Sequence, residues 1–166
     1  MSRSEAARSS TFSIDRLYEA VDEKRRARGL SWQQLAREMG NTSASTLSGI
    51  SRRRVLEGDG VLQMLRWLDR TAESFLIPPG DGGPPLPVVE RGKILRFDTR
   101  GIYAALDAQR RELGLTWREV ADAIGGVAPA SLTRLSKGGR TAFPEIMRIV
   151  GWLHRPVSSV VRVSIW

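Results

Sequence analysis

Apolar residues recur at helical spacing along most of the chain, in short segments separated by glycine or polar turns. Leu17 and Val21 lie on one side of a segment that ends at Gly29, a residue suited to the left-handed position at a helix C-terminus. Ser31 is suited to cap the segment that follows. The other inward positions of this half of the chain are Leu35, Ala36, Met39, Leu47, Ile50, Val61, Met64, Leu65 and Leu68. The pattern predicts four short helices, the last from about Asp59 to Arg70.

The chain repeats itself after 85 residues, and the alignment needs no gap. Trp32 aligns with Trp117, and Gly40 aligns with Gly125. The other matching pairs are Tyr18 with Tyr103, Asp22 with Asp107, Arg25-Arg26 with Arg110-Arg111, Gly29-Leu30 with Gly114-Leu115, Ala36 with Ala121, Leu47 with Leu132 and Trp67-Leu68 with Trp152-Leu153. We therefore expect the same helices twice, in an all-α fold with two tandem helical units.

A segment rich in proline and glycine, IPPGDGGPPLPVVERG at 77–92, separates the copies. Proline removes backbone donors, and both residue types favour turned or extended backbone. The expected divisions of the chain are a disordered tail at 1–13, a first domain at 14–76, a linker at 77–97 and a second domain at 98–166. A linker of roughly 20 residues could extend to about 65 Å at ~3.3 Å per residue, so it would let both domains reach one ligand.

The charge balance favours polyanionic partners. The net charge is +8, from 26 Lys and Arg against 18 Asp and Glu, and the second copy is more basic than the first, at +4 against +2. Cysteine is absent, His154 is the only histidine, and no phosphate-cradling glycine motif occurs. These counts predict no catalytic site, no metal site and no cofactor, so we do not expect an enzyme.

The opening residues, MSRSEAARSSTF, lack the apolar stretch of a signal peptide. No run in the sequence approaches the roughly 18 apolar residues that a membrane helix needs. The lack of cysteine also fits a reducing compartment. We therefore expect a soluble, cytoplasmic protein without a membrane partner.

The segments GLSWQQLAREMGNTSASTLSGI at 29–50 and GLTWREVADAIGGVAPASLTRL at 114–135 resemble the helix-turn-helix of the Cro and phage-repressor family, often called Xre-like. In that family an alanine, a turn glycine four residues later and an aliphatic residue seven after the glycine hold two helices at a fixed angle. The matching residues are Ala36, Gly40 and Leu47 in the first copy, and Ala121, Gly125 and Leu132 in the second. The resemblance covers about 14–76 and 99–160. It implies two lambda-repressor-like helical bundles with a DNA-binding ancestry.

The resemblance also implies which residues would meet double-stranded DNA, because the second helix of this motif enters the major groove. The base-facing positions are then Ser43, Ala44, Ser45, Ser48 and Gly49 in the first copy, and Ala128, Pro129, Ala130, Thr133 and Arg134 in the second. The expected phosphate contacts are Gln33, Arg52, Arg53, Arg54, Arg118, Lys137 and Arg140. Arg134 can bond a guanine edge with two donors, so we expect it to read a base. The alternative for Arg134 and for the basic run at 52–54 is a solvated surface.

Two features depart from the family pattern. Trp32 and Trp117 replace a glutamine that often bonds phosphate; their rings could staple a helix start to the core or donate one bond to phosphate. Ala128 cannot cap the helix that follows it, so this start lacks a side-chain bond worth about 1 kcal/mol. Pro129, however, suits a first helical turn.

Trp67 and Trp152 lie about 100° from the core stripe of their helices. They could form the margin of the core, pack the two copies together or form a homodimer. A contact between copies or molecules requires that Trp67→Ala and Trp152→Ala change the mass in solution or the melting behaviour.

The function expected from these features is sequence-specific binding of double-stranded DNA by both motifs, as a transcriptional regulator of repressor type. Because the two base-facing sets differ, the predicted DNA site is asymmetric. Two alternatives stay open. One is a protein-protein interaction module that has lost base reading, and the other is architectural, sequence-independent DNA binding.

Overall fold

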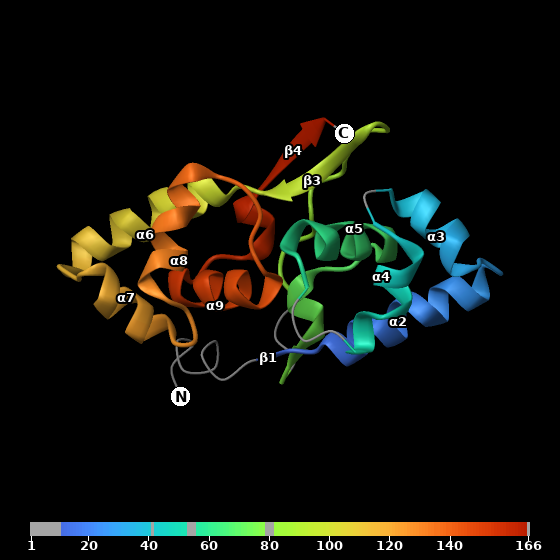
Figure 1. The fold of residues 1–166 in the computed structure, drawn as a ribbon, viewed down its shortest axis with the longest axis horizontal. Helices are drawn as coiled ribbons and strands as arrows, with labels where there is room; N and C mark the ends of the chain where they lie inside the picture. Colours follow the sequence, from blue (N-terminus) through green and yellow to red (C-terminus); the bar gives the residue numbers. More distant parts are fainter. Residues whose placement is uncertain (1–10, 41, 53–55, 79–81, 166) are drawn as a thin grey trace.

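The computed structural model describes residues 11–40, 42–52, 56–78 and 82–165. Over these residues the chain forms two successive sets of four α-helices (Figure 1). The first set is α2 (Ile14–Ala27), α3 (Trp32–Met39), α4 (Ala44–Ser48) and α5 (Gly58–Leu68), and the second is α6 (Thr99–Leu113), α7 (Trp117–Ile124), α8 (Pro129–Arg134) and α9 (Phe143–Leu153). Short 3₁₀ turns lie at Ile50–Arg52, Ala72–Phe75, Leu135–Lys137 and Val157–Val160.

The 85-residue repeat of the sequence is also a repeat of the structure. α3 and α7 begin and end at matching positions, and so do α5 and α9. Leu47 and Leu132, which the sequence places inward, are both fully buried. Each copy therefore folds its shared apolar positions into the same helical arrangement.

The expectation of an all-α fold is wrong, because two small antiparallel sheets complete the structure. β1 (Thr11–Phe12) pairs with β2 (Leu76–Ile77), and β3 (Lys93–Phe97) pairs with β4 (Val161–Ile165). β1 falls in the expected tail, and β3 falls in the expected linker. The sequence of β4, VRVSI, is rich in β-branched residues, which fit a pleated strand better than a helix.

The two repeats lie on opposite sides of an approximate two-fold axis, beside which the matching residues Glu57 and Ala142 pair antiparallel (Figure 1). α2 and α3 lie on the right of the view, and their counterparts α6 and α7 lie at the diagonally opposite places on the left. α4 and α8, the second helices of the two motifs, hold matching positions in the two repeats.

A short backbone bridge joins the repeats at the axis. Glu57 and Ala142, which hold the same position in the two copies, pair antiparallel. Two hydrogen bonds flank the pair: the Gly58 N–H donates to the Thr141 carbonyl at 2.8 Å, and the Phe143 N–H donates to the Leu56 carbonyl at 2.7 Å. Each bond is the symmetry counterpart of the other, as in the isologous interface of a two-fold dimer.

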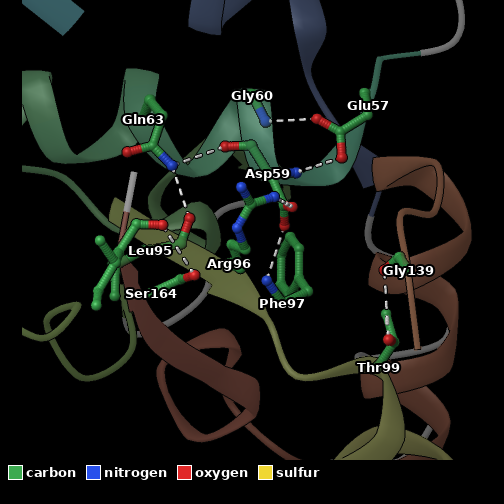
Figure 2. Close-up of polar contacts among 11 residues, drawn as sticks. Glu57, Asp59, Gly60, Gln63, Leu95, Arg96, Phe97, Thr99, Gly139 and Ser164 are labelled. Carbon is green, nitrogen blue, oxygen red and sulfur yellow. Dashed lines mark hydrogen bonds and ion pairs between the residues drawn. The ribbon is translucent and has the colours of Figure 1, made fainter. Parts of the chain in front are cut away.

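A buried polar cluster also joins α5 of the first repeat to β3 of the second (Figure 2). Asp59 accepts a hydrogen bond from the Phe97 N–H at 2.8 Å and pairs with the Arg96 guanidinium at 3.3 Å. The Gln63 amide donates to the Leu95 carbonyl at 2.7 Å. Because Asp59 and Gln63 are almost fully buried, these partners are needed to satisfy them.

The apolar cores of the two repeats are continuous. The Phe143 ring lies 4.7 Å from the Phe12 ring and 6.1 Å from the Phe97 ring, measured between centroids. Phe12 and Phe97 themselves hold the same position in the two repeats. The placement of one repeat relative to the other is thus fixed by packing and hydrogen bonds, and not by the reach of the segment between them.

Candidate nucleic-acid interface

The first helix of each motif begins with a capping box. Ser31 and Gln34 form the box of α3, and Thr116 and Glu119 form the box of α7. The Thr116 N–H donates to the Glu119 carboxylate at 3.0 Å, and this bond, with that of the Thr116 hydroxyl, lowers the pKa of Glu119. The boxes fix where each motif starts.

Gln33 and Arg118 hold the same position in the first turn of α3 and α7. Both side chains are exposed. Among the residues that the structure describes, neither side chain has a hydrogen-bonding or ionic partner. Their donors are therefore available to a phosphate oxygen at the start of each motif.

Buried leucines orient the second helix of each motif. Leu47 in α4 and Leu132 in α8 face the core, which turns the opposite face of each helix outward. The exposed candidates are Ser43, Ser45, Ala128, Pro129, Ala130 and Arg134, and the half-buried ones are Ala44, Ser48, Gly49 and Thr133. These candidates are therefore exposed or half-buried on α4, on α8 and at the ends of these helices.

A cluster of hydroxyl groups forms the start of α4. The Ser43 hydroxyl accepts a hydrogen bond from the Thr46 N–H at 3.2 Å and so caps the helix. The same oxygen lies 3.1 Å from the Ser45 hydroxyl and 2.8 Å from the Thr46 hydroxyl. This helix therefore presents short polar side chains, which would allow a bound molecule to approach its backbone closely.

The start of α8 lacks a side-chain cap. Ala128 holds the N-cap position without a side-chain hydrogen bond and Pro129 follows it, which confirms the expectation from the sequence. The Thr133 hydroxyl donates to the Ala130 carbonyl of its own helix at 3.2 Å. Arg134 is exposed, and in the described part of the chain its guanidinium has no partner.

Basic side chains surround the end of α8. Arg134, Lys137 and Arg140 are exposed, and Arg134 and Arg140 line a hollow of about 220 Å³. Arg100 of α6 joins them, since its guanidinium donates to the Lys137 carbonyl at 3.2 Å. Neither the motif nor the repeat identifies Arg100, because it lies outside the motif and the matching residue of the first copy is Asp15.

Among the residues that the structure describes, the first repeat carries fewer basic groups at the same place. Arg52 is exposed just after α4, and Gly49 stands where the second repeat has Arg134. Arg53 and Arg54, two of the expected phosphate contacts, lie outside the described residues. The two second helices therefore differ: α4 presents small hydroxylated side chains, whereas α8 presents the Arg134 guanidinium.

Trp32 and Trp117 pack against the first helix of their own repeats. The Trp32 ring stacks on Tyr18 with centroids 6.0 Å apart, and the Arg25 guanidinium lies 4.3 Å from the Trp32 centroid. The Trp117 ring stacks on Tyr103 at 5.3 Å. This packing indicates that the two tryptophan rings hold the helix start against the core, and it does not favour a contact with phosphate.

Trp67 and Trp152 also make their contacts within their own repeats. Trp152 is buried, and the Gln109 amide donates to its carbonyl at 3.3 Å. The Trp67 indole N–H donates to the Glu38 carboxylate, and the Lys24 ammonium lies 4.6 Å from the ring centroid. These contacts give no support to a homodimer through either ring.

Comparison with known proteins gives no match that assigns a role to these residues. No protein-family model matches the chain, and neither the curated proteins nor the solved structures include a significant match. None of the described helices is long and apolar enough to cross a membrane. Within the described ranges, no group of three or more His, Cys, Asp or Glu side chains is placed to hold a metal ion.

Proposed function

We propose that this protein binds double-stranded DNA through both helix-turn-helix motifs of one chain, as a transcriptional regulator. The approximate two-fold relation of the repeats, marked by the antiparallel pairing of Glu57 with its counterpart Ala142, is the observation that carries the proposal (Figure 1). It gives α4 and α8 equivalent positions about one axis, and two-fold dimers use such an arrangement to offer two helices to successive major grooves. One chain would then do what two subunits do in a symmetric dimer.

The two motifs would contribute unequally to recognition. The planar guanidinium of Arg134 has no partner among the described residues, and a bidentate bond to guanine is worth about 1–3 kcal/mol of discrimination. Ser43 and Ser45 would add hydroxyl contacts at closer range. The DNA site would therefore be asymmetric, with most of its sequence information under α8.

Phosphate contacts would supply most of the affinity. Gln33 and Arg118 stand at the motif starts, and Arg52, Lys137 and Arg140 follow the second helices. The net charge of +8 supports the same role, because basic groups that neutralise phosphates release counterions. Binding should therefore weaken steeply with salt.

Fluorescence anisotropy with a pool of random duplexes across a salt series tests the proposal, when the bound fraction is sequenced. We expect Arg134→Ala to relax the preference at one or two base positions. Arg52→Ala should instead weaken binding to all duplexes by a similar factor. Arg91→Ala, which removes one positive charge between the repeats, is the matched control. No binding at low salt would overturn the proposal.

Sequence-independent, architectural DNA binding is the second candidate. It is favoured by α4, whose described residues include no side chain able to bond a base edge with two donors. Competition with unrelated DNA separates the two functions. An architectural protein loses its labelled duplex to any competitor, whereas a specific regulator retains it.

A further inference from the structure

We propose that the outer edge of β4 binds a second copy of this chain, whose own β4 adds to it in antiparallel orientation. Two two-stranded sheets, one from each molecule, would join into a single four-stranded sheet. The surface involved includes none of the residues assigned to DNA. The inference therefore stands whether or not the chain binds DNA.

β3 has no free edge to offer. The Leu95 carbonyl and the Phe97 N–H face α5, where Gln63 and Asp59 bond them (Figure 2). Successive residues of a strand direct their backbone groups to opposite edges. Residues 94 and 96 of β3 therefore bond β4, and both edges of β3 are occupied.

β4, in contrast, has one bonded edge and one open edge. Its register pairs Ser164 and Arg162 with residues 94 and 96 of β3. The backbone groups of Val161, Val163 and Ile165 consequently point away from β3. The described part of the chain supplies no backbone partner for these three residues.

The three residues whose backbone groups are open have apolar side chains on one face of the sheet, whereas the exposed Arg162 lies on the other face. Val163 is 46% exposed, and Ile165 is 77% exposed. β-branched residues of this kind favour strand pairing. An exposed apolar edge strand is a template for pairing with another chain unless the protein protects it.

The first repeat protects the corresponding edge. β2 ends at Ile77 after two residues, and Pro78 follows at the position that Val163 holds in the second repeat. A short strand that runs into proline is a common protection of a sheet edge, because proline has no N–H to donate. β4 continues for five residues without a proline. Within this one molecule, therefore, only the second copy leaves its edge open along its described length.

β4 is complementary to itself in one register. When Val163 faces the partner's Val163, Val161 faces the partner's Ile165, and all open backbone groups find partners. Arg162 then lies opposite the partner's Ser164. The register shifted by two residues places Arg162 opposite the partner's Arg162, which is unfavourable in a chain of net charge +8. Like-charge repulsion thus disfavours that shifted register, whereas the register centred on Val163 keeps the two Arg162 side chains apart and pairs every open backbone group.

Site-specific disulfide formation tests the position of the axis, because the chain has no cysteine of its own. Cα atoms of a hydrogen-bonded antiparallel pair lie about 5.5 Å apart, within the range of about 4.4–6.8 Å that a disulfide spans. Under a mild oxidant, we expect Val163→Cys to form linked dimers at least about tenfold faster than Val88→Cys. Val88 is 98% exposed between the repeats and serves as the collision control.

Substitutions at Ser164 test the register. Ser164→Glu would place a carboxylate opposite the partner's Arg162 twice per dimer. We expect it to lower the dimer dissociation constant by about two- to tenfold, as measured by sedimentation without DNA. Ser164→Arg should raise the dissociation constant by a similar factor, and circular dichroism checks that both variants keep the fold.

Wild-type protein is expected to sediment as a concentration-dependent mixture of monomer and dimer. A wild type that stays monomeric at every concentration, with equal linking rates for Val163→Cys and Val88→Cys, would overturn the proposal. A dimer that responds equally to Ser164→Glu and Ser164→Arg would also overturn it. Because no DNA is present, neither result bears on the DNA-binding proposal.

Discussion

Gly58 and Phe143 hold the same position in the two repeats, but one lacks a side chain and the other carries a ring. Each is the first residue of its helix, α5 or α9, beside the axis that relates the copies. The Phe143 ring packs 4.7 Å from Phe12, whereas the Phe97 ring fills the space next to Gly58. The junction is thus a pseudo-symmetric interface in which a ring in one copy is matched by glycine in the other.

Gly58→Ala is expected to destabilise the protein by about 1–3 kcal/mol. A methyl group there would lie 2.9 Å from the Phe97 ring and 3.0 Å from the Thr141 carbonyl oxygen. Gly60→Ala in the same helix is the matched control, because its nearest contact would be Glu57 at 3.6 Å. Alanine's higher helix propensity should make this control up to about 1 kcal/mol more stable than wild type. Chemical denaturation measures both, and equal stabilities would contradict the tight junction.

Asp59→Ala should lower the free energy of unfolding by about 2–3 kcal/mol. The change leaves the Phe97 N–H without its acceptor and removes the ion pair with Arg96. Asp122→Ala, which removes an exposed carboxylate from α7, is the control and should stay within about 0.5 kcal/mol of wild type. If the two variants unfold alike in denaturant, the polar cluster of Figure 2 does not hold the repeats together.

Glu38 makes part of the stability of the first repeat depend on pH. The Arg28 guanidinium and the Trp67 indole both donate to its carboxylate, and these bonds lower the pKa of Glu38. A carboxylate of this kind stabilises the fold above its unfolded pKa of about 4.3, and the stabilisation is lost as pH falls through the folded value.

Glu38→Gln should therefore be less stable than wild type at neutral pH, and the difference should shrink as the pH drops below about 4. The effect should be small and weakened by salt, because Arg28 and Glu38 are partly exposed. Thermal unfolding across pH measures it. A difference that stays constant down to strongly acidic pH would refute the assignment.

Ala128→Ser should stabilise the second repeat by about 0.5–1 kcal/mol. The backbone at this position is already extended, and Ser43 makes the equivalent bond at 3.2 Å at the start of α4. Ala130→Ser, inside the same helix, offers no cap and should bring no gain. Equal unfolding free energies for the two variants would mean that the serine at residue 128 does not cap α8.

The helical part of the fold could be predicted from the sequence, since inward residues such as Leu47 and Leu132 recur at helical spacing and are buried. The strand β3 could not, because it is short and directly follows a proline-rich segment, whereas the β-branched residues of β4 do carry a strand signal. The junction between the repeats could not be predicted either. Glu57 and Ala142 have different side chains, so no shared sequence feature marks the pair, and their pairing depends only on how the helices pack.

The candidate interface was predictable to a similar extent. The exposure of Arg134 and the missing cap at Ala128 follow from local sequence and from the repeat. Arg100 joins the basic cluster from a different helix, so only the tertiary structure brings it there. The spacing of residues within one helix predicts which of its side chains are exposed, whereas contacts between different helices can be known only from the tertiary structure.

The spacing of the two half-sites in DNA selected by the wild-type chain tests the central claim most directly. Because the junction fixes the two motifs, we expect two different sequence elements at one separation. Inserting about 5 base pairs, half of a helical turn, between them should abolish the gain over a single element. Selected sites with variable spacing, or a single element that binds as well as two, would contradict the claim that one chain presents both motifs as a fixed pair.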